Sequence, residues 1–153
     1  MSYDILIFIH ISSAIVLLGV GGGSAFYKFM ADKSNNIDVI VHTNKMVVLA
    51  DWLFTTPSAI VQPISGVLLM YTLDLSLFTP WVLTSILLYI FAGVLWLVAV
   101  YLQIKMKNLA IEAQKEKVSL GKSYFDLVFY WTWLGVVSFF AMGIIFYLMI
   151  FKY

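Results

Sequence analysis

The sequence predicts an all-helical protein, a bundle of four transmembrane helices with both termini on the same side of the membrane. Hydrophobic residues make up 63% of the 153 positions and charged residues only 11%, too few to give a soluble domain of this size a polar surface. Four apolar blocks, residues 5–27, 46–71, 81–104 and 127–151, each exceed the roughly 20 residues that cross a bilayer as a helix. We therefore expect residues 1–153 to form a single integral membrane domain.

The lysines predict the orientation of this bundle. All nine basic residues are lysines, and eight of them lie in the predicted connections 28–45 and 105–126. Because cytoplasmic loops are enriched in basic residues, these connections should face the cytoplasm and the termini the outer, periplasmic side. This sorting accounts for the lysines without a nucleic-acid partner. The first block has no preceding basic residue and no small-residue cleavage pattern, so we expect it to remain as a helix rather than act as a signal peptide.

Local signals place the helix ends. Asn36 is a plausible cap for a lead-in to the second helix, and Thr79 followed by Pro80 is a typical start for the third. Helix-favouring residues after the third block predict that this helix projects into water until Gly121. Ser123, three residues before Asp126, predicts a capping arrangement for the fourth helix.

Polar residues recur on one face of the second block. They follow one another at steps of four, three, four and three, so that they share a helix face: Asp51, Thr55, Ser58, Gln62 and Ser65. The third block carries a similar row that includes Tyr89, Trp96 and Gln103. Hydrogen-bonding side chains are costly against lipid, so both rows should face the interior of the bundle. We refer to the five residues of the second block together with Gln103 as the polar stripe.

Two ionisable residues lie inside predicted spans. His10 could act as a ligand or proton carrier, or serve as a hydrogen-bonded structural residue. Asp51 has equivalent alternatives, since it lies closer to the cytoplasmic interface. Counting residues from the helix ends separates the two by about 15 Å along the membrane normal, which excludes a direct His–carboxylate pair. The groups expected at the level of His10 are Gln62, Ser65, Tyr89, Met142 and Met149.

The first block also carries four glycines. Gly21 lies on the same helix face as His10, where a glycine could open a slot for a cofactor. Gly19 and Gly23 form a small-xxx-small pair on a neighbouring face, which suits close helix contact or a homodimer. The absence of cysteine excludes disulfides, iron–sulfur clusters, thiolate nucleophiles and covalently attached haem.

Several segments carry a resemblance to a known family. They are "FIHISSAIVLLGVGGGSAFYK" (8–28), "LADWLFTTPSAIVQPISG" (49–66), "WLVAVYLQIKMKNLA" and "FYLMIFK". Across nearly its whole length the chain resembles the bacterial family of predicted integral membrane proteins called domain of unknown function 2269. This resemblance implies the bacterial inner membrane as location and no known activity.

A more distant resemblance concerns the four spans with a histidine near the start of the first. This arrangement is similar to the four-span membrane protoporphyrinogen oxidase and to copper resistance D proteins. In the oxidase family a histidine of the first helix and a later lysine are linked to activity and b-type haem. His10 matches the histidine. The lysine has no counterpart inside the second or third helix, since Lys105 lies at the end of the third, and this argues against the oxidase activity itself.

Three functional hypotheses remain open. The first is a redox protein that binds haem b, with His10 as the axial iron ligand, Gly21, Gln62, Tyr89 and Met142 around the porphyrin, and a quinone as partner. The second is a small transporter or metal-handling protein that uses the polar stripe from Asp51 to Gln62. The third is a non-catalytic accessory subunit of another membrane protein. The sequence contains no recognisable catalytic motif, so no reaction is predicted.

Overall fold

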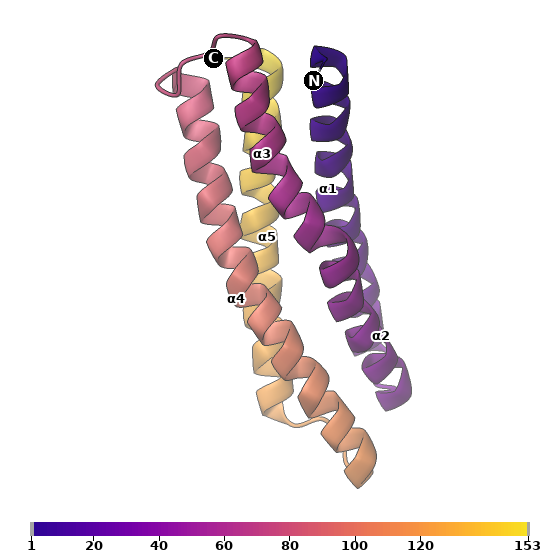
Figure 1. Ribbon diagram of the computed structural model, residues 1–153. Coiled ribbons are helices and arrows are strands. Elements are labelled where there is room, and N and C mark those ends of the chain that lie inside the picture. The colour runs from indigo at the N-terminus through magenta and orange to yellow at the C-terminus, as the bar shows by residue number, and fades with distance from the viewer. Residues whose placement is uncertain (1, 153) are drawn as a thin grey trace.

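A computed structural model describes residues 2–152, and this range contains helices and no strand (Figure 1). The elements in chain order are α1 (Tyr3–Lys33), α2 (Ile37–Ala50), the π-helix η1 (Asp51–Thr55), α3 (Thr56–Thr72), α4 (Pro80–Glu116) and α5 (Lys122–Phe151). The elements α2, η1 and α3 follow one another without a break. The described residues therefore contain four helices that are long and apolar enough to cross a membrane, with mean hydropathies of 2.3, 1.4, 2.4 and 2.4. The predicted fold class is confirmed.

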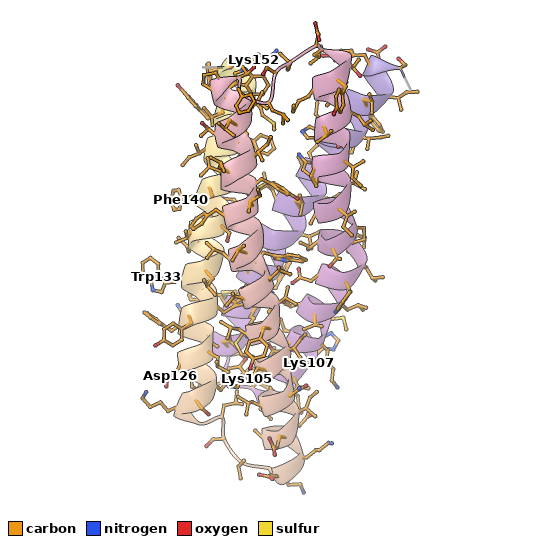
Figure 2. All side chains as sticks on the ribbon, turned by 60° about the vertical axis from the view of Figure 1, so that its left-hand side comes forward. Lys105, Lys107, Asp126, Trp133, Phe140 and Lys152 are labelled. Atoms are coloured by element: carbon orange, nitrogen blue, oxygen red, sulfur yellow. The ribbon has the colours of Figure 1, made fainter. Side chains whose placement is uncertain are left out.

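Both ends of the chain lie at one end of the bundle (Figure 1). We call this the terminal end; it also holds the turn between α3 and α4. The opposite, lysine-rich end holds the turns after α1 and α4. Figure 2 shows Lys105, Lys107 and Asp126 towards the lysine-rich end and Lys152 at the terminal end. The assignment of the lysine-rich end to the cytoplasm stays a prediction.

The helices are longer than the apolar blocks that predict them. Most of the predicted connections, 28–45 and 105–126, is helical, because α1 runs on to Lys33, the second span begins at Ile37, and α4 continues to Glu116. Hydropathy marks only the part of a helix that lies in hydrocarbon, whereas helix-favouring polar residues extend the same helix beyond it.

Two of the four helix-end signals hold. The side chain of Asn36 accepts hydrogen bonds from two backbone N–H groups and caps α2, and α4 begins at Pro80 after Thr79. The predicted end of the third helix at Gly121 is wrong, because Lys117 adopts a left-handed conformation (φ 56°) that ends α4.

The predicted cap of the fourth helix is also wrong. The N-cap of α5 is Gly121, and Ser123 lies within the helix. The carboxylate of Asp126 binds Lys122 Nζ, at 2.8 Å for the shorter contact, instead of taking part in a capping arrangement.

The bundle consists of two helix pairs. α1 packs along α3 and α4 packs along α5, while α2 contacts both α1 and α4 and joins the pairs in the lysine-rich half. Large apolar side chains cover the outside: Trp133 and Phe140 of α5 point away from the bundle and are 56% and 70% exposed (Figure 2). An apolar exterior around a polar interior is the arrangement expected for a protein surrounded by lipid.

Candidate functional site

The polar stripe is buried inside the bundle. Each of its six members, Asp51, Thr55, Ser58, Gln62, Ser65 and Gln103, is no more than 9% exposed. The helical spacing therefore identified a set of inward-facing side chains. Five of these side chains belong to two separate groups, one around His10 and one around Asp51, and Ser58 lies between the two groups in the sequence.

The first group, here the terminal-side cluster, comprises His10, Ser13, Gln62 and Ser65. His10 Nε2 lies 3.2 Å from Gln62 Nε2, and His10 Nδ1 lies 2.9 Å from Ser65 Oγ. The Ser13 hydroxyl is directed at Gln62 Oε1 and the carbonyl of His10. An added Cβ on Gly66 would lie only 3.2 Å from His10 Cε1, so the imidazole packs against this glycine. The expected proximity of His10 to Gln62 and Ser65 is confirmed.

These contacts define the hydrogen-bonding state of His10. An amide nitrogen only donates, so His10 Nε2 accepts a hydrogen bond from Gln62 Nε2. In a neutral imidazole Nδ1 then carries the hydrogen and donates it to Ser65 Oγ, while the Ser65 hydroxyl donates to the carbonyl of Val61 (2.8 Å). Both ring nitrogens are therefore engaged.

This arrangement does not fit a haem held by His10. An axial ligand needs a free imidazole lone pair, but the lone pair of Nε2 accepts from Gln62. Haem binding stays a prediction that would require Gln62 to move away.

The other positions predicted to surround a porphyrin are dispersed. Tyr89 OH donates to the carbonyl of Ala59 at 2.7 Å, a carbonyl that lacks its usual helical partner because Pro63 has no N–H. Met142 is half-buried on α5, which packs mainly along α4, whereas His10 lies between α1 and α3. Gly21 is exposed, with open space where a Cβ would be.

The glycines of α1 differ in their surroundings. Gly22 is close to α5, since an added Cβ would lie 3.7 Å from Phe139 Cε2. Gly19 and Gly23 have no neighbouring atom within 4 Å of an added Cβ, and they line a groove with His42 and Met46 of α2. The close helix contact expected at this pair is therefore absent from residues 2–152.

The second group, here the central cluster, comprises Asp51, Thr55 and Gln103. Asp51 and Thr55 are the first and last residues of η1, where the backbone N–H of Thr56 bonds to the carbonyl of Asp51, five residues earlier. Pro57 follows directly and supplies no backbone N–H. Such one-turn π-helices inside α-helices frequently occur at functional sites. Here the π-helix occurs at the buried carboxylate of the span.

The central cluster contains polar atoms without partners. Thr55 Oγ1 donates to Asp51 Oδ1 at 2.8 Å, and the side chain of Gln103 lies beside the carboxylate. Asp51 Oδ2 and Gln103 Oε1 are buried and receive no hydrogen bond from any described residue, and Trp96 Nε1, two turns from Gln103 on α4, donates none. Neither ion pair found within residues 2–152 includes Asp51. The carboxylate thus lacks a cationic neighbour, and the Gln103 amide beside it carries N–H groups that can donate to Oδ2, although no hydrogen bond of ordinary length is formed there.

A third group, here the ion-pair cluster, was not predicted. It comprises Lys28 and Asp32 of α1, Asn44 of α2 and Tyr124 of α5. Lys28 Nζ donates to Asp32 Oδ2 (2.9 Å) and to Tyr124 OH (3.0 Å), and Tyr124 OH donates to Asp32 Oδ1 (2.6 Å). Lys28 is only 1% exposed, so it lies in the interior rather than in a connection. The i,i+4 spacing of Lys28 and Asp32 was the available signal.

Asn44 and Trp131 complete the surroundings of this ion pair. Asn44 Nδ2 donates to Tyr124 OH at 2.9 Å, and the Trp131 ring lies 5.7 Å from Lys28 Nζ. The three clusters follow one another along the bundle. At about 1.5 Å per residue, Asp51 lies about 16 Å from Gln62 and about 10 Å from Asn44 along the second span.

Comparison with known proteins identifies a family for this chain, but no individual curated protein or solved structure that matches it. The described part of the chain holds no group of three or more His, Cys, Asp or Glu residues that could bind a metal ion. No curated protein and no solved structure matches the chain. A family described as "Predicted integral membrane protein (DUF2269)" matches residues 4–153. With nearly all of its sequence covered by that match, the chain belongs to this family of integral membrane proteins.

Proposed function

We propose that the protein transports a small cation across the membrane, and that Asp51 is the carboxylate that binds it. The observation that carries this proposal is the burial of Asp51, 5% exposed, without a cationic partner and with Oδ2 lacking a donor. An unpaired charge inside a bundle costs on the order of several kcal/mol, so we expect such a group to have a ligand.

The comparison with Asp32 strengthens this proposal. Both carboxylates are buried, but Asp32 is neutralised by Lys28 on the same helix. Asp51 has no such partner within the described chain, so its charge must be balanced by a species from outside. Ionisable groups that face a bundle interior commonly mark ion or proton pathways.

The polar stripe supplies a path to this site. From Asp51 the hydroxyls of Thr55 and Ser58 lead towards Gln62, in the direction of the terminal end. All of these side chains are buried, which keeps their polar groups away from lipid. The path begins at the π-helix and ends at the terminal-side cluster.

The test is ion uptake by the purified protein in lipid vesicles. We expect cation uptake above that of protein-free vesicles, and we expect Asp51→Asn to abolish it, because the amide carries no charge. Asp126→Asn is the matched control, since Asp126 is 51% exposed and bound to Lys122 at the lysine-rich end, and it should retain uptake. Wild-type vesicles without uptake of any cation would contradict the proposal and favour an accessory subunit.

The haem alternative has its own test. A visible absorption spectrum of the purified protein, reduced minus oxidised, should show no Soret band, because Gln62 and Ser65 occupy both nitrogens of His10. A Soret band that disappears in His10→Ala would instead support the redox hypothesis. A quinone or protein partner, a homodimer and the bacterial inner membrane stay predictions.

A further inference from the structure

We infer that the ion bound at Asp51 is a proton rather than a metal cation. This inference rests on the proposed transport function and names its substrate. It follows from the number and kind of oxygen atoms at the central cluster, from the missing hydrogen-bond donors, and from the neighbouring charges.

The central cluster offers too few oxygens for a metal cation. Mg²⁺ requires six ligands and Ca²⁺ six to eight, and channels that select K⁺ surround the ion with rings of carbonyl oxygens. The side chains of Asp51, Thr55 and Gln103 supply four oxygens, of which Asp51 Oδ1 and Thr55 Oγ1 are already bonded to each other. The carbonyl of Asp51 accepts from the N–H of Thr56. The buried side-chain oxygens left without a partner are Asp51 Oδ2 and Gln103 Oε1.

A bound proton would remove two unfavourable features of the central cluster, the unpaired buried charge of Asp51 and the lack of a donor for Oδ2. Added to Asp51 Oδ2, it removes the unpaired buried charge and converts an acceptor without a donor into an O–H group that can donate. A buried oxygen that lacks a donor is unfavourable, so an O–H at this position is a gain that a distant cation does not provide. Gln103, whose amide lies beside the carboxylate, is the neighbouring side chain with an unused acceptor.

Within residues 2–152, no charged group on the neighbouring elements is paired with the Asp51 carboxylate. The titratable and charged groups on the elements near η1 are engaged with other partners or exposed, apart from Lys107 on α4, which is half-buried. On α1, Lys28 pairs with Asp32, and His10 bonds to Gln62 and Ser65. On α4, Tyr89 donates to the carbonyl of Ala59. The exposed groups are His42 and Lys45 on α2 and Lys105 on α4. None of them supplies a charge to Asp51 within the described range.

The transfer step is a simple proton exchange with water. The O–H bond of the Asp51 carboxyl group breaks, the proton forms a bond to a water oxygen to give hydronium, and the electron pair remains on the carboxylate. The reverse reaction reloads the site. The hydroxyls of Thr55 and Ser58 line the adjacent part of the polar stripe, whereas the fully buried Met106 lies one turn beyond Gln103 on the lysine-rich side.

The first experiment detects the bound proton directly. Infrared difference spectra of the protein in lipid, recorded across a pH titration, should contain a carboxylic-acid C=O band. This band should disappear in Asp51→Asn, remain in Asp126→Asn, and shift in frequency in Gln103→Leu because the neighbouring amide is removed. If no such band is assignable to Asp51, the inference is overturned.

The second experiment separates the inference from the proposed function. Vesicles with an internal pH dye and a valinomycin-driven potential report proton uptake, and parallel vesicles report uptake of radioactive Na⁺ and Rb⁺. We expect Asp51-dependent proton uptake, retained in part in Asp51→Glu, and metal-ion uptake no higher than in protein-free vesicles. Asp51-dependent uptake of Na⁺ or Rb⁺ without proton uptake would overturn the inference and leave the transport proposal standing. Absence of all uptake would overturn both.

Discussion

The terminal-side and central clusters lie on the same span, about 16 Å apart, yet they differ in how their polar atoms are paired. Around His10, both ring nitrogens have partners, and no buried side-chain atom of the cluster lacks one within residues 2–152. Around Asp51, two buried oxygens lack a donor. The difference separates structure from function: a saturated network fixes helices in place, whereas an unsaturated one has capacity for a ligand.

The largest effect on stability should come from His10→Ala. The change removes the imidazole that bonds to Gln62 Nε2 and Ser65 Oγ, and it creates a cavity between α1 and α3. Hydrogen bonds in membrane proteins average about 0.6 kcal/mol each, and the lost packing adds to this, so we expect a loss of about 2 kcal/mol. Unfolding in mixed detergent micelles measures it. A variant as stable as the wild type would mean that the saturated cluster does not fix the helices.

A smaller effect should come from Gly66→Ala. Its Cβ would lie 3.2 Å from His10 Cε1, so the imidazole would have to shift and its two hydrogen bonds would lengthen. We expect Gly66→Ala to be less stable than Gly23→Ala by about 1 kcal/mol, of the order of one such hydrogen bond, because both variants gain the helix preference of alanine. Gly23→Ala is the matched control, because its added Cβ meets open space and alanine favours helix. Equal unfolding free energies for the two variants would contradict close packing at Gly66.

Tyr89→Phe should cost about 0.6 kcal/mol. It removes the hydroxyl that donates to the Ala59 carbonyl left free by Pro63, a contact between α4 and α3. Because Gln103 lies on the same helix as Tyr89, the variant should also change the infrared band of Asp51. An unchanged band would mean that this contact does not position α4 at the central cluster.

The smallest effect on stability should come from Asp51→Asn. The neutral amide is similar in size to the protonated carboxyl group that we infer, and like that group it carries hydrogens that it can donate within the cluster. We expect an unfolding free energy within about 0.5 kcal/mol of the wild type, together with the loss of ion uptake. A loss of stability as large as that of His10→Ala would show that Asp51 is structural and would remove the contrast between the clusters.

Periodicity predicted which side chains face the interior but not how they pair. The steps of four and three from Asp51 to Ser65 are sufficient to identify a buried face, because helix geometry is regular. The partners of His10 were also within reach, since depth in the bilayer follows from residue count. The missing donors at Asp51 could not be predicted, because they depend on the rotation of α4 that brings Gln103 beside the carboxylate.

The ion-pair cluster shows a second limit. Lys28 was interpreted as a residue of a cytoplasmic connection because lysine is normally excluded from a membrane interior. Its burial depends on Tyr124, which is 96 residues later in the chain and belongs to the last helix. Contacts of this kind require the packing of α5 against α1, which the sequence pattern alone does not specify.

The position of both charges of this pair on α1 has a consequence for biosynthesis. Lys28 and Asp32 are four residues apart, so they can neutralise each other as soon as this segment coils, before any later part of the chain has been made. The first segment can thus enter the bilayer without carrying an unbalanced charge inward. Tyr124 belongs to α5 and is synthesised after Lys28, Asp32 and Asn44, so its bonds to these residues form only once α5 packs against α1 and α2.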